Sequence, residues 1–150
     1  MQLILMRHGE AQSPVTTDAA RQLTALGWAQ AASTADRLMQ RVKPDLFVVS
    51  PLMRAQQTRQ AFDAYCTGVP VITFDGIKPD DKAAPALNWL SRQQAQCIVV
   101  ICHMNIVAYL GGLLVDEPPR SFELAEARVY EQPVIAHGLS VEQTRIVPLN

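Results

Sequence analysis

The feature that most constrains the fold of this chain is a repeated alternation of short apolar runs with longer amphipathic stretches. Apolar runs typical of buried strands lie at residues 2–6, 45–49, 69–74 and 97–102. Stretches with the apolar pattern of helices lie at residues 24–42, 51–66, 80–96 and 105–115. This strand–helix alternation predicts an α/β fold with three layers, in which a mostly parallel sheet has helices on both faces.

The last part of the chain has a different pattern. Residues 128–135 and 141–147 have the composition of two strands joined by a turn at His137-Gly138, which favours an antiparallel edge on the sheet. Pro133 has no backbone N–H, so we expect the first of these strands at an edge position. Because the sequence contains no internal repeat, low-complexity tract or linker, we expect a single domain over residues 1–150.

Charge and cysteine content exclude several classes of partner. The 13 Lys and Arg against 14 Asp and Glu give a net charge of −1, so nucleic acid and anionic membranes are not expected partners. Three cysteines without a CxxC pair argue against a disulfide framework. The apolar N-terminus has no basic stretch before it, and no apolar run is long enough to span a bilayer. We therefore expect a soluble, cytoplasmic protein.

Three polar clusters follow directly after three of the predicted strands. They are Arg7 to Glu10, Ser50 to Arg54, and His103 to Asn105. Ligands of parallel α/β sheets bind beyond the carboxyl ends of the strands. We therefore expect two arginines and two histidines to converge on one pocket: Arg7, His8, Arg54 and His103.

The residue types in these clusters suit phosphoryl transfer. Arg7 and Arg54 offer two planar sets of donors that match phosphate oxygens. A neutral imidazole such as His8 is a competent nucleophile near pH 7, and neighbouring arginines should lower its pKa and keep it unprotonated. The second imidazole, His103, can donate a hydrogen bond to the phosphoryl oxygens. Gly9 is expected where the backbone comes close to the anion.

Other site chemistries find no support in the sequence. The histidines are far apart and lie near arginines, and neither an HExxH nor a paired-cysteine motif occurs, so we expect no metal. No P-loop or GxGxxG segment occurs, so we expect no nucleotide cofactor. A cysteine-based phosphatase would need an arginine six positions after its nucleophile, but Ile72, His103 and Ala108 stand there.

The polar clusters resemble the motifs of a known family. Arg7-His8-Gly9 is similar to the Arg-His-Gly signature of the histidine phosphatase superfamily, which also holds the cofactor-dependent phosphoglycerate mutases. The segment Ser50 to Thr58 is similar to its Ser-Pro-x-x-Arg-Ala-x-x-Thr motif, and Cys102-His103 to its second-histidine site. The short chain and the segment Asp18 to Gly27 most resemble the small SixA-type phosphohistidine phosphatases. Three motifs in the family's order make the signal specific.

The resemblance implies a phosphoglycerate mutase-like fold and a phosphatase without a cofactor. It implies that His8 is the nucleophile, that Arg7 and Arg54 clamp the phosphate, and that His103 contacts the phosphoryl group. Arg21 matches an arginine of the small phosphatases and is expected to help bind phosphate or substrate. The implied substrate is a histidine-phosphorylated signalling protein, such as a histidine-containing phosphotransfer domain, dephosphorylated through phospho-His8.

The sequence departs from the wider family where a general acid is expected. Many members carry a glutamate soon after the third strand, but residues 75–81 contain none. An alkoxide leaves badly without an acid, whereas the imidazole released from phosphohistidine is a much weaker base. The gap therefore favours phosphohistidine as substrate. Four carboxylates remain as alternative proton sources: Glu10, Asp18, Asp75 and Asp80.

Two alternatives to a phosphohistidine phosphatase remain open. One is a small-molecule phosphomonoesterase or mutase of the same superfamily, and the other is a non-catalytic phosphate-binding module. Several polar residues also have plain structural interpretations. Arg21 would suit a surface salt bridge, Glu10 would suit the orientation of an arginine, Asn105 would suit a helix cap, and His137 would suit a turn.

Overall fold

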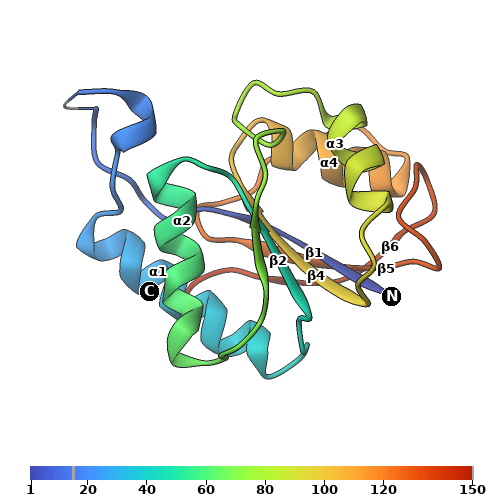
Figure 1. Ribbon diagram of the computed structural model, residues 1–150, viewed down its shortest axis with the longest axis horizontal. Helices are drawn as coiled ribbons and strands as arrows, with labels where there is room; N and C mark the ends of the chain where they lie inside the picture. Colours follow the sequence, from blue (N-terminus) through green and yellow to red (C-terminus); the bar gives the residue numbers. More distant parts are fainter. Residues whose placement is uncertain (15, 150) are drawn as a thin grey trace.

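One sheet forms the centre of the protein in the computed structural model, which describes residues 1–14 and 16–149 (Figure 1). Within these residues six strands follow the order β3-β2-β4-β1-β5-β6. Their bounds are Gln2–Arg7 (β1), Leu46–Val49 (β2), Val71–Thr73 (β3), Cys97–Cys102 (β4), Ala127–Glu131 (β5) and Val141–Ile146 (β6). The first four strands pair in parallel, whereas β5 is antiparallel to β1 and β6 to β5. The predicted mostly parallel sheet with an antiparallel C-terminal edge is confirmed.

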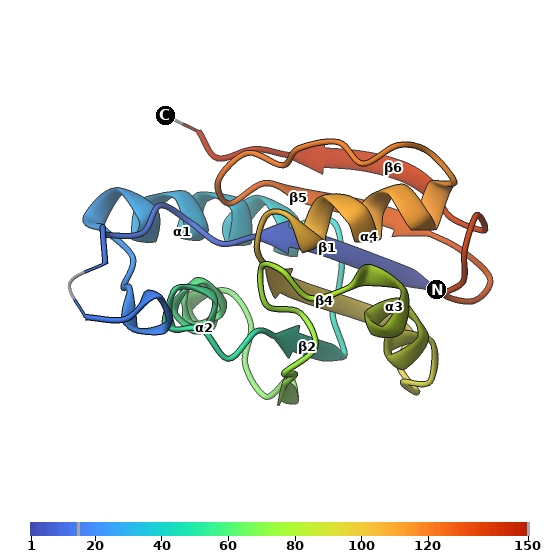
Figure 2. The same ribbon diagram turned by 90° about the horizontal axis from the view of Figure 1, so that it is seen from above.

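Helices cover both faces of this sheet (Figures 1 and 2). The α-helices are Ala25–Met39 (α1), Met53–Gln60 (α2), Ala83–Ser91 (α3) and Ile106–Val115 (α4), and 3-10 turns cover Asp18–Ala20 (η1) and Ala61–Ala64 (η2). One core cluster joins α3 and α4 to one face of the sheet. A second cluster joins α1, α2 and η2 to the other face. The predicted three-layer arrangement is therefore confirmed.

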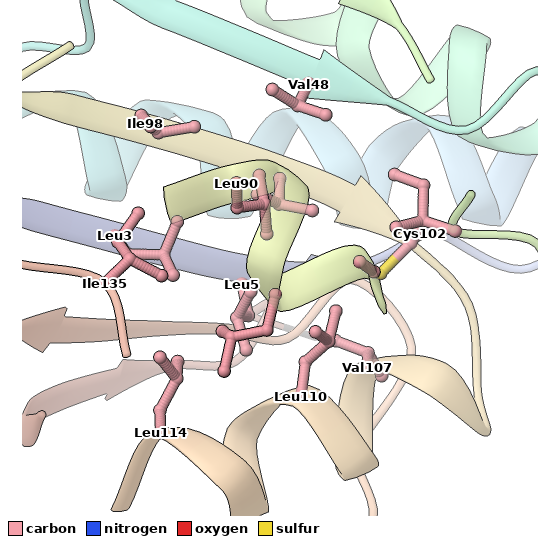
Figure 3. Close-up of a cluster of buried hydrophobic side chains, with 14 of the residues drawn as sticks. Leu3, Leu5, Val48, Leu90, Ile98, Cys102, Val107, Leu110, Leu114 and Ile135 are labelled. Atoms are coloured by element: carbon pink, nitrogen blue, oxygen red, sulfur yellow. The ribbon is translucent and has the colours of Figure 1, made fainter. Parts of the chain in front are cut away.

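Strand β1 shows why the apolar runs are continuous. Leu3 and Leu5 pack into the first core cluster, whereas Ile4 and Met6 pack into the second. Figure 3 shows Leu5 between Leu90 of α3 and Leu110 of α4, with Leu3 beside Ile135. Burying a side chain of this size contributes roughly 1.5–3 kcal/mol. A strand covered on both faces therefore needs apolar residues at every position.

The helices are shorter than the apolar pattern predicts. Thr24 caps α1 as expected, since its hydroxyl oxygen accepts a hydrogen bond from the Gly27 N–H at 3.0 Å. The predicted helix over residues 80–96 begins only at α3, because the Asp81 carboxylate accepts the Lys78 N–H at 2.8 Å and closes a turn there. Residues 51–66 form α2 and then tighten into η2.

The expected edge position of the first C-terminal strand is wrong. Strand β5 lies between β1 and β6 in the sheet. It ends at Glu131, so Pro133 follows the strand and its missing N–H removes no ladder hydrogen bond.

The strands carry their polar clusters to one edge of the sheet. Arg7 at the end of β1 pairs with Cys102 at the end of β4, and Val49 at the end of β2 pairs with Ile101. The residues that follow these three strands therefore lie next to one another at the carboxyl edge of the sheet. None of the helices in residues 1–14 and 16–149 is long and apolar enough to span a membrane.

Candidate active site

The four residues predicted to converge do lie together at the carboxyl edge of the sheet. The rings of His8 and His103 have centroids 5.1 Å apart. The guanidinium of Arg54 lies beside them, with Nε 3.3 Å from Nε2 of His8. Arg7 and Arg54 both line a cavity of about 380 Å3 together with His8. Residues from the ends of β1, β2 and β4 thus share one site.

The ring of His8 is held with its unprotonated nitrogen towards Arg54, whose Nε donates a hydrogen bond to it. Its Nδ1 lies 2.6 Å from the carbonyl oxygen of Gly9. A carbonyl oxygen only accepts hydrogen bonds, so Nδ1 carries the proton and Nε2 has the lone pair. The backbone is fixed as well, because the His8 N–H donates to the Cys102 carbonyl at 3.1 Å and the His8 carbonyl accepts from the Ala125 N–H at 2.9 Å. Nε2 therefore faces Arg54 in a fixed orientation.

Burial keeps the His8 ring neutral. The side chain is buried, and burial together with the nearby Arg54 and Arg7 charges lowers its pKa to about 4, partly offset by the hydrogen bond to Gly9. The neutral form is the nucleophilic form. The arginines lower this pKa, as predicted, although burial is the larger cause.

Arg54 is one of the most deeply buried charges of the site, with 3% of its surface exposed. It lies in the first turn of α2, where its carbonyl accepts the hydroxyl proton of Thr58 at 2.7 Å. The same hydroxyl oxygen accepts the N–H of Gly9 at 3.2 Å. Thr58 therefore ties the backbone next to His8 to the helix that carries Arg54.

Arg7 is positioned by a segment far away in the sequence. Its Nη1 donates to the carbonyl oxygen of Phe122 at 2.8 Å, and its backbone N–H donates to the carbonyl of Glu126 at 3.0 Å. Its Nε is buried and has no hydrogen-bond partner among the described residues. The loop between α4 and β5 thus holds Arg7 at the site.

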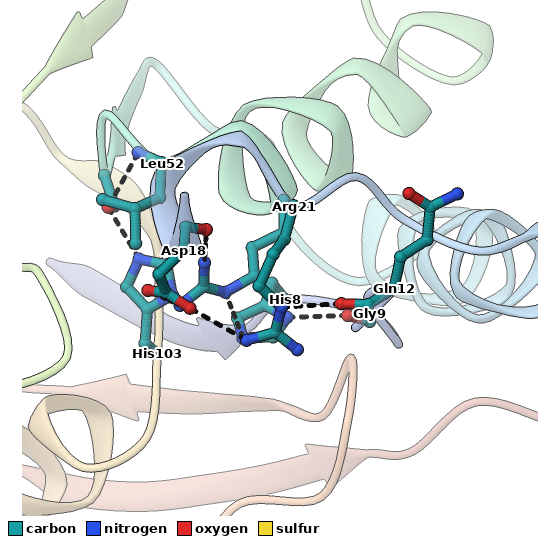
Figure 4. A network of polar contacts seen from close by, with 9 residues as sticks. His8, Gly9, Gln12, Asp18, Arg21, Leu52 and His103 are labelled. Carbon is teal, nitrogen blue, oxygen red and sulfur yellow. Dashed lines mark hydrogen bonds and ion pairs between the residues drawn. The ribbon is translucent and has the colours of Figure 1, made fainter. Parts of the chain in front are cut away.

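His103 is fixed by a serine that directly follows β2. The Oγ of Ser50 lies 2.7 Å from Nε2 of His103 and accepts the N–H of Leu52 at 3.3 Å (Figure 4). Burial first, and then the charges of His8 and Arg54, lower the pKa of His103 to about 2. Its Nδ1 is buried without a hydrogen-bond partner in residues 1–14 and 16–149.

The unpartnered buried nitrogens point to the kind of ligand that the site takes. In the described part of the chain they are Nε of Arg7 and Nδ1 of His103, and both belong to this site. Leaving a buried polar group unsatisfied costs about 1–3 kcal/mol. A tetrahedral oxyanion beside Nε2 of His8 would satisfy such donors. The arrangement therefore suits transfer of a phosphoryl group to His8.

Arg21 lines the cavity and pairs with Asp18. The Asp18 carboxylate receives Nη1 of Arg21 at 3.0 Å and Nη2 of Arg54 at 3.2 Å. Nε of Arg21 donates to the carbonyl of Gln12 at 2.6 Å. Figure 4 shows Asp18 and Arg21 beside His8. The salt bridge considered for Arg21 is present, and its partner Asp18 in turn contacts Arg54.

The other carboxylates considered as proton sources lie differently. Glu10 lines the cavity, but its carboxylate accepts the hydroxyl proton of Thr24 at 2.8 Å, so the expectation that it orients an arginine is wrong. Asp75 pairs with Lys78 at 2.6 Å. Asp80 is exposed and does not line the cavity.

Three further residues differ from expectation or lie apart from the site. A Cβ on Gly9 would lie 2.5 Å from the carbonyl oxygen of Gly27, so Gly9 is needed for close packing against α1. This packing, and not the expected approach of the backbone to an anion, is the main reason for a glycine here. Asn105 occupies the N-cap position of α4 as predicted, but its side chain makes no capping hydrogen bond. His137 pairs with Asp116 at 3.0 Å on the surface.

Sequence reasoning gave no role to Ser50, Thr58 or the Phe122 carbonyl. Both Ser50 and Thr58 belong to the second motif. Ser50 directly follows a buried strand and Thr58 lies in the next helix, and these positions could have indicated that both residues lie near the site. The contact from Phe122 to Arg7 spans 115 positions and left no local signal in the sequence.

The same motifs and architecture occur in known proteins. The family model described as "Histidine phosphatase superfamily (branch 1)" matches residues 3–79, which include His8 and Arg54. The phosphohistidine phosphatase SixA homolog of Haemophilus influenzae is 31% identical over 120 residues, which are 71% of this chain and 73% of that protein. Phosphohistidine phosphatase SixA of Escherichia coli is 29% identical over 131 residues, covering 81% of this chain and 80% of that protein.

A solved structure extends the likeness over the whole sheet. The structure of the protein histidine phosphatase SixA complexed with tungstate superposes with a TM-score of 0.89 at 25% identity, covering 99% of this chain and 97% of that one. The coverage includes the segments that carry His103 and the Phe122 carbonyl, which lie beyond the family-model match. The fold that the motif resemblance implied is therefore confirmed.

Proposed function

Because the chain belongs to the histidine phosphatase superfamily (branch 1), we propose that it is a phosphohistidine phosphatase acting through a phospho-His8 intermediate. The observation that carries the proposal is the unprotonated Nε2 of His8, which is fixed by the Nδ1 contact to Gly9 and accepts a hydrogen bond from Nε of Arg54 at 3.3 Å. The similarity to proteins named phosphohistidine phosphatase SixA supports the choice of substrate.

The first step of the proposed reaction transfers the phosphoryl group to His8. Arg7 and Arg54 bind phosphoryl oxygens through charged hydrogen bonds, each contributing about 1.5–3 kcal/mol. Nε2 of His8 attacks phosphorus, and the bond between phosphorus and the substrate nitrogen breaks with its electron pair going to that nitrogen. The contact from Nδ1 to Gly9 at 2.6 Å stabilises the positive charge that the ring gains.

His103 stabilises the phosphoryl oxygens in this reaction. In the proposed reaction the ring proton of His103 lies on the otherwise unpartnered Nδ1, and Nε2 accepts the hydroxyl proton of Ser50, whose Oγ lies 2.7 Å away. Nδ1 then donates to an oxygen of the transferring group as charge develops there. In the second step water attacks phosphorus, the bond to Nε2 of His8 breaks, and phosphate leaves with the histidine regenerated.

The proposal includes a partner and a cellular setting. The partner is a phosphohistidine-bearing protein such as a histidine-containing phosphotransfer domain of a signalling relay, and residues 1–150 act as a single domain on it. The setting is the cytoplasm, supported by the unpaired state of the cysteines in the described residues, Cys66, Cys97 and Cys102.

The test compares His8→Ala with His137→Ala on a phosphorylated phosphotransfer protein. His137 serves as the control because it is exposed and pairs with Asp116 away from the site. The wild-type protein and His137→Ala should release phosphate, whereas His8→Ala should lose turnover by several orders of magnitude and still bind vanadate.

Two results would contradict the proposal. Unchanged turnover in His8→Ala would exclude a histidine nucleophile. Equal turnover of an alkyl phosphate and of the phosphohistidine substrate would favour a small-molecule phosphomonoesterase, because an alkoxide needs an acid that phosphohistidine does not need.

A further inference from the structure

A carboxylate lies on the outer side of the phosphate clamp. Asp18 in η1 is exposed, and its Oδ2 contacts Nη2 of Arg54 at 3.2 Å while its backbone carbonyl accepts Nη1 at 3.0 Å. The opposite side of the same guanidinium presents Nε to Nε2 of His8 at 3.3 Å. Arg54 therefore contacts His8 through Nε and Asp18 through Nη1 and Nη2.

A negative charge at this position is unfavourable for phosphate binding alone. A carboxylate within contact of the clamp repels a phosphoryl dianion and competes for the same donors. The hydrogen bond from Arg21, followed by the contacts with Arg54, lowers the pKa of Asp18, so the carboxylate is ionised near pH 7. Asp18 can then accept a hydrogen bond but has no proton to donate. Its role must concern another part of the substrate.

The leaving ring of phosphohistidine offers a matching group. One ring nitrogen carries phosphorus, and the other can carry a proton. When this second nitrogen is protonated, breaking the phosphorus–nitrogen bond releases a neutral imidazole, with the electron pair remaining on the nitrogen that held phosphorus. When it is unprotonated, the same step must release an imidazolate, which is a far poorer leaving group. A carboxylate beside the second nitrogen favours the protonated form.

Resting on the proposed function, we infer that Asp18 is a specificity-determining residue that accepts the N–H of the leaving phosphohistidine ring. The ring leaves neutral with that proton in place, so no proton moves while phosphorus is transferred to His8. Asp18 lines the cavity together with His8 and Arg54, and a ring attached to phosphorus must lie in this cavity. Glu10 lines the same cavity, but its carboxylate contacts the Thr24 hydroxyl at 2.8 Å, whereas Asp18 contacts Arg54 at 3.2 Å.

This inference also accounts for the missing glutamate in residues 75–81. A phosphomonoester releases an alkoxide that needs a proton, and the ionised Asp18 cannot supply it. A phosphohistidine ring brings its own proton and needs only an acceptor. The carboxylate that the site keeps is thus suited to a nitrogen leaving group.

The experiment compares two substrates in Asp18→Asn and Asp18→Glu. The substrates are a phosphohistidine peptide and p-nitrophenyl phosphate, whose leaving group has no N–H to offer. Asp63→Asn is the matched control, since Asp63 is an exposed carboxylate paired with Arg59 at 2.7 Å at the far end of α2. The ratio of kcat/KM for phosphohistidine to kcat/KM for the aryl phosphate should fall roughly 10-fold in Asp18→Asn, because a neutral acceptor is weaker than a charged one. Asp18→Glu should recover most of the ratio, and Asp63→Asn should not change it.

Inorganic phosphate provides a second measurement. Removing the negative charge should let phosphate inhibit Asp18→Asn at a lower concentration than wild type. Weaker inhibition, or an equal loss on both substrates, would mean that Asp18 only positions Arg54 and would overturn the inference. An unchanged rate on phosphohistidine would overturn it as well. A wild-type protein inactive on phosphohistidine would instead overturn the proposed function, and this inference with it.

Discussion

The site has an inner half and a rim that are built in different ways. The inner half consists of His8, Ser50, Arg54 and His103, all buried, with short contacts to backbone or to a buried hydroxyl. The rim segment, residues 16–22, contributes Asp18 and Arg21 through an ion pair at 3.0 Å near solvent. In the proposed function the inner half carries out phosphoryl transfer, and by the further inference the leaving group of the substrate lies at the rim. Substitutions in the inner half should therefore lower kcat/KM strongly for every substrate, whereas substitutions at the rim should change kcat/KM slightly and by an amount that depends on the substrate.

The largest effect should come from removing the inner clamp. Arg54→Ala should lower kcat/KM roughly 10³-fold on every phosphorylated substrate, because a buried charged donor set is lost. Arg59→Ala on the same helix is the control, since Arg59 pairs with Asp63 away from the cavity. Steady-state kinetics with two unrelated phosphorylated substrates tests this, and a loss confined to one of them would contradict a general clamp.

The buried His8 should make stability depend on pH. Its pKa is about 4 in the folded protein and about 6.5 when unfolded, so the unfolded state gains the proton first. Stability should therefore fall as the pH drops from 6.5 towards 4, by about 3 kcal/mol from this residue.

Urea unfolding at several pH values compares wild type with His8→Asn and His137→Asn. The first variant should lose much of this acid sensitivity, and the second, at an exposed position, should behave as wild type. The same pH dependence in all three proteins would show that His8 is not held neutral.

Ser50 should affect the rate through His103. Ser50→Ala removes the hydroxyl that lies 2.7 Å from Nε2 of His103, so the ring proton of His103 is no longer fixed on one nitrogen. We therefore expect kcat to fall roughly 10-fold, with a smaller change in KM. Ser140→Ala is the control, because Ser140 is also buried and donates to Gln132 at 2.7 Å outside the cavity lining. Both variants should lose stability, but only Ser50→Ala should lose kcat. Equal activity of the two variants would show that Ser50 does not position His103.

Arg21 should have the smallest effect. Its contact with Asp18 is a partly exposed ion pair, and such pairs contribute about 0–1 kcal/mol. Arg21→Ala should therefore lower kcat/KM by no more than about fivefold. A loss as large as that of Arg54→Ala would mean that Arg21 binds the phosphoryl group directly and that the rim belongs to the clamp.

The difference between the two parts also explains what could be predicted from the sequence. Strands β1, β2 and β4 are buried on both faces, so their apolar runs predict where each strand lies in the sequence. Because the strands are parallel, the same runs predict that His8, Arg54 and His103 lie at one edge of the sheet. The rim has no such periodicity, and the role of Asp18 depends on a contact with Arg54 that spans 36 positions. The helix ends were predicted less well, because local turns such as that of Asp81 with Lys78 compete with the helix.

The most direct test of the account is to locate the phosphoryl group on the trapped intermediate. Wild-type protein is mixed briefly with a phosphohistidine protein, quenched in alkali, and examined by mass spectrometry and by phosphorus–nitrogen NMR. We predict an acid-labile, alkali-stable phosphoryl group on Nε2 of His8, because Nδ1 is engaged by the Gly9 carbonyl at 2.6 Å. A phosphoryl group on Nδ1 or on another residue, or phosphate release with no labelled protein, would contradict the account.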